Sequence, residues 1–553
     1  MIQKNYFHDS LLLFIVFTVL YIFPLGVRPL SAPDETRYGE ISREMVASGN
    51  YVSPRLNDLR YFEKPVMGYW LNALSLKAFG ENNFAVRFSS ALSAGISALI
   101  VFFLVRRYTK DRFLAFMASA IFLTFLEVVC LGVFSLLDGM VSMFLTGAMG
   151  LFLFAWEVRN ERRKFHGRLF LFGIFLGLAC MTKGFLAIAV PASILIPFML
   201  WEGKWKELFR IIWMPLLAII LVMLPWSILI HQQEPDFWNF FFWHEHIKRF
   251  LADNAQHKAS PIYFFIVLPL AAIPWTFVGP AALKSLSRKE FQSSFMRFVL
   301  CWLVFPFLFF SASSGKLVTY ILPCFPPLAI LFAKGLQTYF MTDNHKSFNR
   351  GAIILAAIWS GVMLTFILIQ TFTWNGFSVY SSIWKTVLFI AGLSAYIVLL
   401  LASVKSRHYQ NKFILYTLSP LFFLISANFL VPDLTLAVNS PGEFLLRHKY
   451  RIEKDSIIVS DSGAIQIVCW YYKRNDLYQL NDGGELEYGF KQPDARHRLL
   501  DFKDFAELVS QNQGRVVLII RQRNYNNWME YLPKHILKES SGQQDQGFVF
   551  CKY

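Results

Sequence analysis

Long apolar runs separated by short polar segments make up most of this chain. A run of about 20 residues with almost no charge is long enough to cross a bilayer as a helix. Such runs lie near residues 11–29, 85–106, 112–129, 131–156, 168–182, 185–201, 208–230, 261–281, 295–312, 318–336, 351–371, 383–403 and 411–431. We therefore predict a polytopic α-helical membrane protein with about thirteen transmembrane helices. The region around Glu127 and Asp138 admits a different division, and the segment MTKG predicts a short turn before residue 185.

The pattern changes after about Pro432, where a polar segment begins. The segments DSIIVSDS, DLYQL, RVVLIIR and GFVFCKY predict strands, while GAIQIVCWYYKR and Asp504–Gln511 predict helices. A strand, a helix and a strand in succession indicate a βαβ unit. We therefore expect a transmembrane domain (residues 1–431), with polar loops at 30–84 and 231–260, followed by a small α/β domain (residues 432–553).

Composition supports a membrane protein, and charge predicts its orientation. The chain is 55% hydrophobic, has a mean hydropathy of +0.42 and carries a net charge of +16. In a soluble protein this charge would suggest a nucleic-acid partner, but here the basic residues gather in loops that all fall on one side of the predicted helices. These loops lie near residues 106–112, 159–168, 204–210, 284–297, 334–350 and 405–412. Because cytoplasmic loops are enriched in Lys and Arg, we place them and the N-terminus inside, and the α/β domain outside.

The first outer loop carries a high density of charge beside a predicted helix, with eleven charged side chains between residues 32 and 65. Basic residues on the outer side run against the usual charge bias. Since Arg and Lys donors match the oxygens and charge of a phosphate, we interpret the outer basic residues as candidate phosphate ligands. They are Arg37, Arg60 and Lys64 in the first loop, and Lys248 and Arg249 in the second. Ordinary ion pairing at a solvated surface is the alternative.

Asp34 and Glu35 follow the first predicted helix directly, at the expected boundary between membrane and water. A carboxylate there suits a general base or a ligand for a substrate cation. Asp34 also precedes ETRYGEISREM, whose apolar spacing predicts a helix. A helix N-cap is therefore the alternative role for this side chain.

Two histidines and two acids suggest a metal site. His244, Glu245 and His246 lie in the second outer loop, and with Glu63 of the first they offer ligands that suit zinc. Hydrogen-bonded side chains near a membrane surface are the simpler alternative. The residues alone therefore do not decide between a metal site and ordinary hydrogen bonding.

Other polar residues border the predicted helices. Lys183 (in MTKGF) and Lys316 (in SSGKLVTYIL) lie in short outer turns. A lysine at a helix end commonly extends its amine to water, and this is the simplest interpretation of both. Arg87, Glu127 and Asp138 are interpreted as polar contacts between packed helices.

Several longer motifs resemble a known family. They are PDETRYGEISREM, LRYFEKPVMGYW, MTKGFLA, FFWHEHIKRF, DNAQH and SGKLVTYIL. Together they resemble the bacterial 4-amino-4-deoxy-L-arabinose (aminoarabinose) transferases of lipid A modification, which are membrane glycosyltransferases of the GT-C fold. The resemblance extends over nearly the whole chain, including the α/β tail. Two positions depart from the pattern: Val318 stands where Pro is expected, and His244 where an apolar residue is common.

The resemblance implies transfer of aminoarabinose from undecaprenyl phosphate to lipid A phosphates, at the periplasmic face of the bacterial inner membrane. Such a reaction belongs to lipopolysaccharide biosynthesis and polymyxin resistance, and it needs no nucleotide cofactor and no nucleic acid. Asp34 corresponds to the first-loop acid that is treated as catalytic in this fold. The implied phosphate- or carrier-binding positions are Arg37, Tyr61, Lys64, Lys183, Arg249, Lys316 and Tyr320. The positions implicated in a divalent metal site, with zinc as the candidate, are Glu63 and His246.

The implied reaction bears on the role of Asp34. A phosphate acceptor is already ionised at neutral pH, so we expect Asp34 to position the acceptor or hold the ammonium of the sugar. In a related enzyme that mannosylates protein hydroxyls from a polyprenyl phosphate, which is the nearest alternative, Asp34 would be a true base. A flippase or transporter of lipid-linked sugars is an alternative of another class. Transporters often contain inverted repeats and ionisable residues at mid-membrane, whereas the charges here gather at one face and no repeat is visible.

Overall fold

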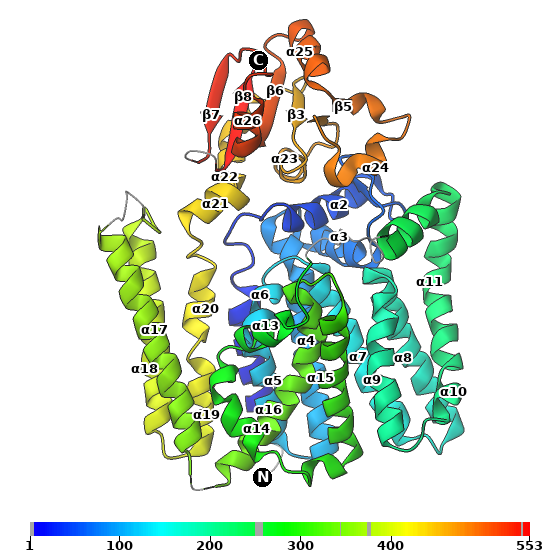
Figure 1. Cartoon of the computed structure of the whole chain (residues 1–553), viewed down its shortest axis with the longest axis vertical. Coiled ribbons are helices and arrows are strands. Elements are labelled where there is room, and N and C mark those ends of the chain that lie inside the picture. Colours follow the sequence, from blue (N-terminus) through cyan, green and yellow to red (C-terminus); the bar gives the residue numbers. More distant parts are fainter. Residues whose placement is uncertain (1–4, 249–257, 343, 373–377, 543–545) are drawn as a thin grey trace. The chain divides into compact units, whose positions relative to one another are not determined.

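The computed structural model describes residues 5–248, 258–342, 344–372, 378–542 and 546–553, and side chains from residue 11 onward except those of residues 244–248 (Figure 1). Contacts divide the chain into two compact units. The helical unit comprises Met1–Pro24, Ser89–Gly376 and Ile383–Leu430. The mixed unit comprises Leu25–Phe88, Phe377–Ser382 and Val431–Tyr553. The charged first loop thus belongs to the same unit as the C-terminal α/β segment.

The helical unit is built from the predicted apolar runs, each of which contains helix in the described residues. Its elements are α1 (Asn5–Phe17), η1 (Thr18–Ile22), most of α4 (Asn83–Thr109), α5 (Arg112–Thr124), α6 (Leu126–Gly132), α7 (Leu137–Glu157), α8 (Arg162–Lys183), α9 (Leu186–Trp201), α10 (Glu207–Ile211), α11 (Trp213–Gln233), η2 (Asn239–Lys248), α13 (Tyr263–Ala271), η3 (Trp275–Val278), α14 (Gly279–Ser285), η4 (Glu290–Gln292), α15 (Ser294–Ala312), η5 (Val318–Cys324), α16 (Phe325–Phe340), α17 (Lys346–Phe372), α18 (Ile383–Lys405), α19 (Tyr409–Leu418) and α20 (Leu421–Ala427). The α8–α9 turn at MTKG is confirmed, because α8 ends at Lys183 and Gly184 has a φ of +82°. Glycine adopts this left-handed backbone without a steric penalty.

Eight helices within the described residues are long and apolar enough to cross a membrane, or up to ten if each of two bent pairs is one span. The other three predicted runs form shorter helices: Leu11–Ile22, Leu186–Trp201, and the pair α19 and α20. Proline lacks a backbone donor and clashes with the preceding turn. Accordingly, the first helix ends before Pro24, and Pro420 lies between α19 and α20. The chain is a multi-pass membrane protein, as predicted, although fewer helices than thirteen meet the length of a full span.

The two bent pairs meet at their breaks. The axis bends by 65° between α5 and α6, and by 98° between α13 and the segment Trp275–Ser285. The backbone N–H of Leu126 donates to the carbonyl of Ile273 (2.9 Å), and the indole N–H of Trp275 donates to the hydroxyl of Thr124 (2.9 Å). A helix break in apolar surroundings needs such partners, because water cannot supply them.

The mixed unit contains the predicted α/β fold. Its sheet has the order β5-β4-β3-β6-β8-β7. The strands β5, β4, β3 and β6 are parallel to one another, and β8 pairs antiparallel with both β6 and β7. The predicted βαβ unit is confirmed as β3, α23 and β4. The elements of the unit are α2 (Asp34–Ser48), β1 (Arg55–Leu56), β2 (Leu59–Arg60), α3 (Met67–Phe79), α21 (Asp433–Asn439), α22 (Gly442–His448), η7 (Lys449–Arg451), β3 (Ile457–Ser460), α23 (Ile465–Tyr472), β4 (Tyr478–Leu480), η8 (Gly484–Leu486), α24 (Glu487–Phe490), η9 (Arg496–Arg498), β5 (Leu499–Leu500), α25 (Phe502–Gln511), β6 (Val516–Arg521), α26 (Gln522–Trp528), β7 (Leu537–Ser540) and β8 (Phe548–Lys552). Cys469 and Cys551 are buried and free in this unit.

A short hairpin joins the first loop to the α/β segment inside the mixed unit. The buried side chain of Asn57, in the β1–β2 turn, donates to the carbonyl of Leu477 (2.8 Å) and accepts from the N–H of Leu477 (3.0 Å). The turn itself is held by Glu44 of α2, whose carboxylate accepts from the N–H groups of Asn57 (2.6 Å) and Asp58 (2.8 Å). These reciprocal bonds fix the hairpin between α2 and the entrance of β4.

Candidate active site

The first turn of α2 carries an acidic residue and a basic residue that were both predicted from the sequence to belong to the site. Asp34 is the first residue of the helix, and Arg37 lies three residues later on the same face. Their side chains form an ion pair. The N-cap residue is Pro33, and no side chain caps the helix, so the interpretation of Asp34 as an N-cap is wrong. With 42% of its side chain exposed, Asp34 remains accessible to a ligand.

Arg37 lies at the centre of a cluster of polar groups, and its side chain is only 10% exposed. Its guanidinium donates to Glu485 (2.6 Å) and to the hydroxyl of Tyr61 (3.4 Å), and it lies 5.2 Å from the centre of the Tyr38 ring. Its Nε atom is buried without a hydrogen-bond partner among the described residues. Glu485 comes from η8, directly after β4, and is not among the site residues predicted from the sequence. The NDGGE segment, a turn signal after a predicted strand, was the only available hint.

The electrostatics of this cluster follow from burial and from the neighbouring charges. Burial raises the pKa of Tyr61 well above its ordinary value, so its phenol stays protonated and can donate a hydrogen bond. Burial also raises the pKa of Glu485; Arg37 opposes this shift, while Glu63 and Asp34 add to it. Two carboxylates, of Asp34 and Glu485, thus bind one guanidinium, and Glu63 acts on Glu485. Carboxylates accept hydrogen bonds, so the arrangement suits a ligand that carries positive charge or hydroxyl groups.

Lys64 and Glu63 follow Tyr61 and lie in the same unit. The amine of Lys64 donates to the backbone carbonyl of Glu63 (3.0 Å), and both side chains are half-buried. Among the described side chains, no three His, Cys, Asp or Glu residues form a group that could hold a metal ion. His246 belongs to η2, but its side chain lies outside the described residues, as does Arg249 entirely. The metal therefore stays a prediction.

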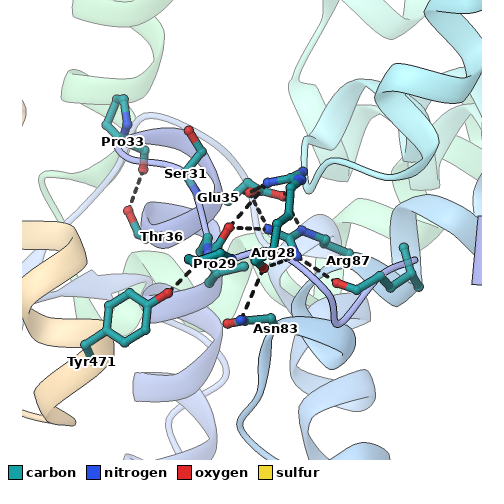
Figure 2. Close-up of polar contacts among 11 residues, drawn as sticks. Arg28, Pro29, Ser31, Pro33, Glu35, Thr36, Asn83, Arg87 and Tyr471 are labelled. Carbon is teal, nitrogen blue, oxygen red and sulfur yellow. Dashed lines mark hydrogen bonds and ion pairs between the residues drawn. The ribbon is translucent and has the colours of Figure 1, made fainter. Parts of the chain in front are cut away.

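Glu35 has a different environment from Asp34, although the two are adjacent. Figure 2 shows Arg28 and Arg87 converging on its carboxylate, which is completely buried. Arg87 donates at 2.6 and 2.8 Å and Arg28 at 2.6 and 3.2 Å, and the backbone N–H of Ser31 donates at 2.9 Å. Burial alone would raise the pKa of Glu35, but the two guanidinium groups lower it to about 2. Glu35 is therefore ionised and fully bonded, which leaves Asp34 as the accessible acid.

In the helical unit, the structure brings together Lys183 and Tyr320, which the sequence analysis named separately. The amine of Lys183 lies 2.5 Å from a carboxylate oxygen of Asp138, in the first turn of α7, and 4.9 Å from the centre of the Tyr320 ring. The three residues line a cavity of about 20 Å³, which is space for one water molecule. The amine of Lys183 thus binds a carboxylate rather than only water, and Asp138 is an ion-pair partner rather than a simple packing contact.

Lys316 lies apart from this cavity lining. Its side chain is buried, and its amine donates to the carbonyl of Ser313, three residues earlier in the same turn. A buried amine with a backbone partner stabilises the local turn. The phosphate-binding role implied for Lys316 stays a prediction.

The chain resembles known proteins over nearly its whole length. The family model for dolichyl-phosphate-mannose-protein mannosyltransferases matches residues 8–241, and that for the C-terminal domain of the arabinosyl transferase ArnT matches residues 436–549. An undecaprenyl phosphate-α-4-amino-4-deoxy-L-arabinose arabinosyl transferase of Shewanella sediminis is 38% identical over 94% of this chain and 94% of its own length. A protein of the same name from Erwinia tasmaniensis is 37% identical over 95% of this chain and 96% of its own length.

Among solved structures, the fold is similar to the crystal structure of ArnT from Cupriavidus metallidurans bound to undecaprenyl phosphate, with a TM-score of 0.80 and 21% identity. The match covers 99% of this chain and 98% of that one. At this identity the likeness concerns the fold, which is that of GT-C membrane glycosyltransferases, whereas the curated relatives match the sequence over nearly its full length. This chain therefore belongs to the family of undecaprenyl phosphate-α-4-amino-4-deoxy-L-arabinose arabinosyl transferases.

Proposed function

We propose that this protein transfers 4-amino-4-deoxy-L-arabinose from undecaprenyl phosphate to phosphate groups of lipid A, at the periplasmic face of the bacterial inner membrane. The observation that carries this proposal is the similarity to arabinosyl transferases at 37–38% identity along nearly the whole chain. The bond between the anomeric carbon and the carrier phosphate breaks, and a bond to an oxygen of the acceptor phosphate forms. Undecaprenyl phosphate is the leaving group.

The reaction involves two phosphates, and each unit offers cations that suit a phosphate. Arg37 and Lys64 belong to the mixed unit, and Lys183 belongs to the helical unit. Cations placed at the leaving phosphate stabilise the negative charge that grows as the glycosidic bond breaks. The ion pair with Asp138 holds the Lys183 amine at the cavity beside Tyr320.

The ammonium group of the sugar needs a different partner. Asp34 and Glu485 both contact Arg37, and 42% and 38% of their respective side chains are exposed. Such carboxylates are suited to binding an ammonium group by charge-assisted hydrogen bonds. We therefore assign Asp34 to positioning of the substrate rather than to proton removal. A divalent metal held by Glu63 and His246 would add a further positive charge for a phosphate, and no step here depends on it.

Mass spectrometry of lipid A tests the proposed reaction directly. Lipid A from cells that express this gene should carry added aminoarabinose, and lipid A from cells without it should not. The matched control is expression of the Asp34→Ala variant at equal membrane abundance. Unmodified lipid A together with mannose on secreted proteins would instead identify a protein mannosyltransferase, and accumulation of the unused donor in the periplasmic leaflet of the inner membrane would identify a flippase.

The topology follows from the same proposal. We expect a phosphatase reporter, which folds only outside the cytoplasm, to be active when fused after Tyr553 and inactive when inserted near Lys289. The reason is that the six basic loops fall on one side of the thirteen predicted helices, and basic loops remain in the cytoplasm. An inactive fusion at the C-terminus beside an active one near Lys289 would reverse the orientation and contradict a periplasmic site.

A further inference from the structure

The segment that precedes α2 has neither helix nor strand, and buried side chains bind its backbone instead. Residues 23–33 are irregular. Arg87, near the start of α4 and fully buried, donates to the carbonyls of Leu25 (2.7 Å), Arg28 (2.9 Å) and Pro29 (2.8 Å). Since buried carbonyls need partners, one guanidinium fixes the course of this segment while it also binds Glu35.

The C-terminal α/β segment, in the same unit, holds the next residues. The N–H of Leu30 donates to the hydroxyl of Tyr471 in α23 (3.2 Å), and the N–H of Ala32 donates to the carbonyl of Asn439 (2.7 Å). In Figure 2, Tyr471 approaches this segment from the side opposite Arg87. The residues just before Asp34 are therefore held from two directions.

Stability alone is a weak explanation for this cluster. A fully buried arginine (Arg87) and a partly buried one (Arg28) on one buried glutamate carry a large desolvation cost, and well-packed apolar residues often replace such clusters without loss. What apolar residues cannot supply is a set of directional bonds to backbone carbonyls. A second buried ion pair on α2 makes the contrast clear, because Arg43 bonds to Glu40 (2.6 and 2.8 Å) within the helix and leaves the segment before Asp34 untouched.

We infer that Glu35 is a positioning residue: with Arg28 and Arg87 it fixes the segment that leads into α2, and thereby holds Asp34 in the orientation that glycosyl transfer requires. Tyr471 supports the same segment from the α/β side. This inference rests on the proposed role of Asp34 at the substrate.

The first test compares Glu35→Gln with Glu40→Gln in full-length protein, purified in lipid nanodiscs, with the undecaprenyl phosphate-linked sugar and lipid A. Both changes remove one charge from a fully buried ion pair on the same helix. Small misplacements of a positioning group cost up to roughly a hundredfold in rate, so Glu35→Gln should lower kcat by about ten- to a hundredfold and weaken donor binding, as Asp34→Asn is expected to do. Glu40→Gln should cost stability, because it also breaks a buried ion pair, but it should retain kcat within about threefold, since that pair lies within α2. Equal losses of kcat in the two variants would overturn the inference.

A double-substitution cycle with Asp34→Asn separates positioning from general destabilisation. If Glu35 acts through Asp34, then Glu35→Gln should cause little further loss in the Asp34→Asn background. Independent, multiplicative losses would refute the inference. If Asp34→Asn keeps full activity, the proposed role of Asp34 fails; if it is impaired while Glu35→Gln is fully active, only the positioning role fails.

A milder pair of variants decides the matter should Glu35→Gln fail to fold. Tyr471→Phe removes only the hydroxyl that accepts from Leu30, whereas Tyr472→Phe removes a hydroxyl on the same helix that donates to the carbonyl of Leu445 (3.1 Å). Tyr471→Phe should lower kcat several-fold and raise amide exchange in residues 25–37, and Tyr472→Phe should change neither. A larger loss of kcat in Tyr472→Phe than in Tyr471→Phe would contradict the inference, as would unchanged amide exchange and kcat in Tyr471→Phe.

Discussion

Replacing Asp34 by asparagine should lower the transfer rate by roughly ten- to a hundredfold, the loss expected for one charge-assisted contact. Asparagine keeps the shape and much of the hydrogen bonding but cannot neutralise an ammonium group. Because the acceptor phosphate is already ionised near neutral pH, with a second pKa of about 6, no proton needs to be removed. The fall in rate of the wild-type enzyme at acidic pH should therefore persist in the variant, and donor binding should weaken. The measurement is the pH dependence of transfer, with donor binding determined separately.

The competing mechanism gives the opposite pattern. If Asp34 were a general base, the acidic limb of the profile would arise from its own protonation and would disappear in Asp34→Asn. Donor binding would then be unchanged, because a base that acts on the acceptor contributes little to the donor complex. A lost acidic limb together with unchanged donor binding would rule out the positioning role.

Lys64→Ala should lower the rate of transfer by about ten- to a hundredfold, the loss expected for one charge-assisted contact. Arg37→Ala should lower the rate by at least as much. Arg37 binds the carboxylates of both Asp34 and Glu485, so its removal leaves two like charges without their shared partner and also removes a proposed phosphate ligand. The measurement is transfer to lipid A in membranes, normalised to the amount of inserted protein.

Arg60→Ala is the matched control for this pair. Arg60 was also a candidate phosphate ligand in the same charged loop, but it binds the exposed carboxylate of Asp494 (3.0 Å), so its loss should change transfer by about twofold at most. Wild-type rates in both Arg37→Ala and Lys64→Ala would show that the phosphate ligands lie elsewhere.

The local pattern of the chain was sufficient to predict its elements. The apolar runs fold as helices because a backbone in lipid must satisfy its own hydrogen bonds. RVVLIIR and GFVFCKY became β6 and β8, since short β-branched and aromatic runs suit a buried sheet. The predicted helix in the first loop is also present as α2. The sequence placed helix breaks less well, because the bend at Phe125 and the interruption before Leu137 depend on packing against other helices.

Part of the candidate site also followed from the sequence, since motif resemblance identified Asp34, Arg37, Tyr61 and Lys183 by position. The ion-pair partners of these residues could not be predicted from the sequence. Glu485 meets Arg37 across 448 residues of sequence, and Asp138 meets Lys183 across 45. Ion pairs at such separations leave no periodic signal, because a charged residue in a polar segment has the same pattern whether it faces water or a partner.

Asp34 and Glu35 show most directly which properties depend on the sequence alone and which depend on the tertiary structure. The sequence alone determined that two acids begin a helix beside the membrane, since charge, apolar spacing and the preceding apolar run are all local properties. Only the tertiary structure decided that Glu35 is buried between Arg28 and Arg87 while Asp34 remains accessible beside Arg37. Successive residues of a helix point about 100° apart, and which direction leads to the interior is decided by the elements that pack against the helix.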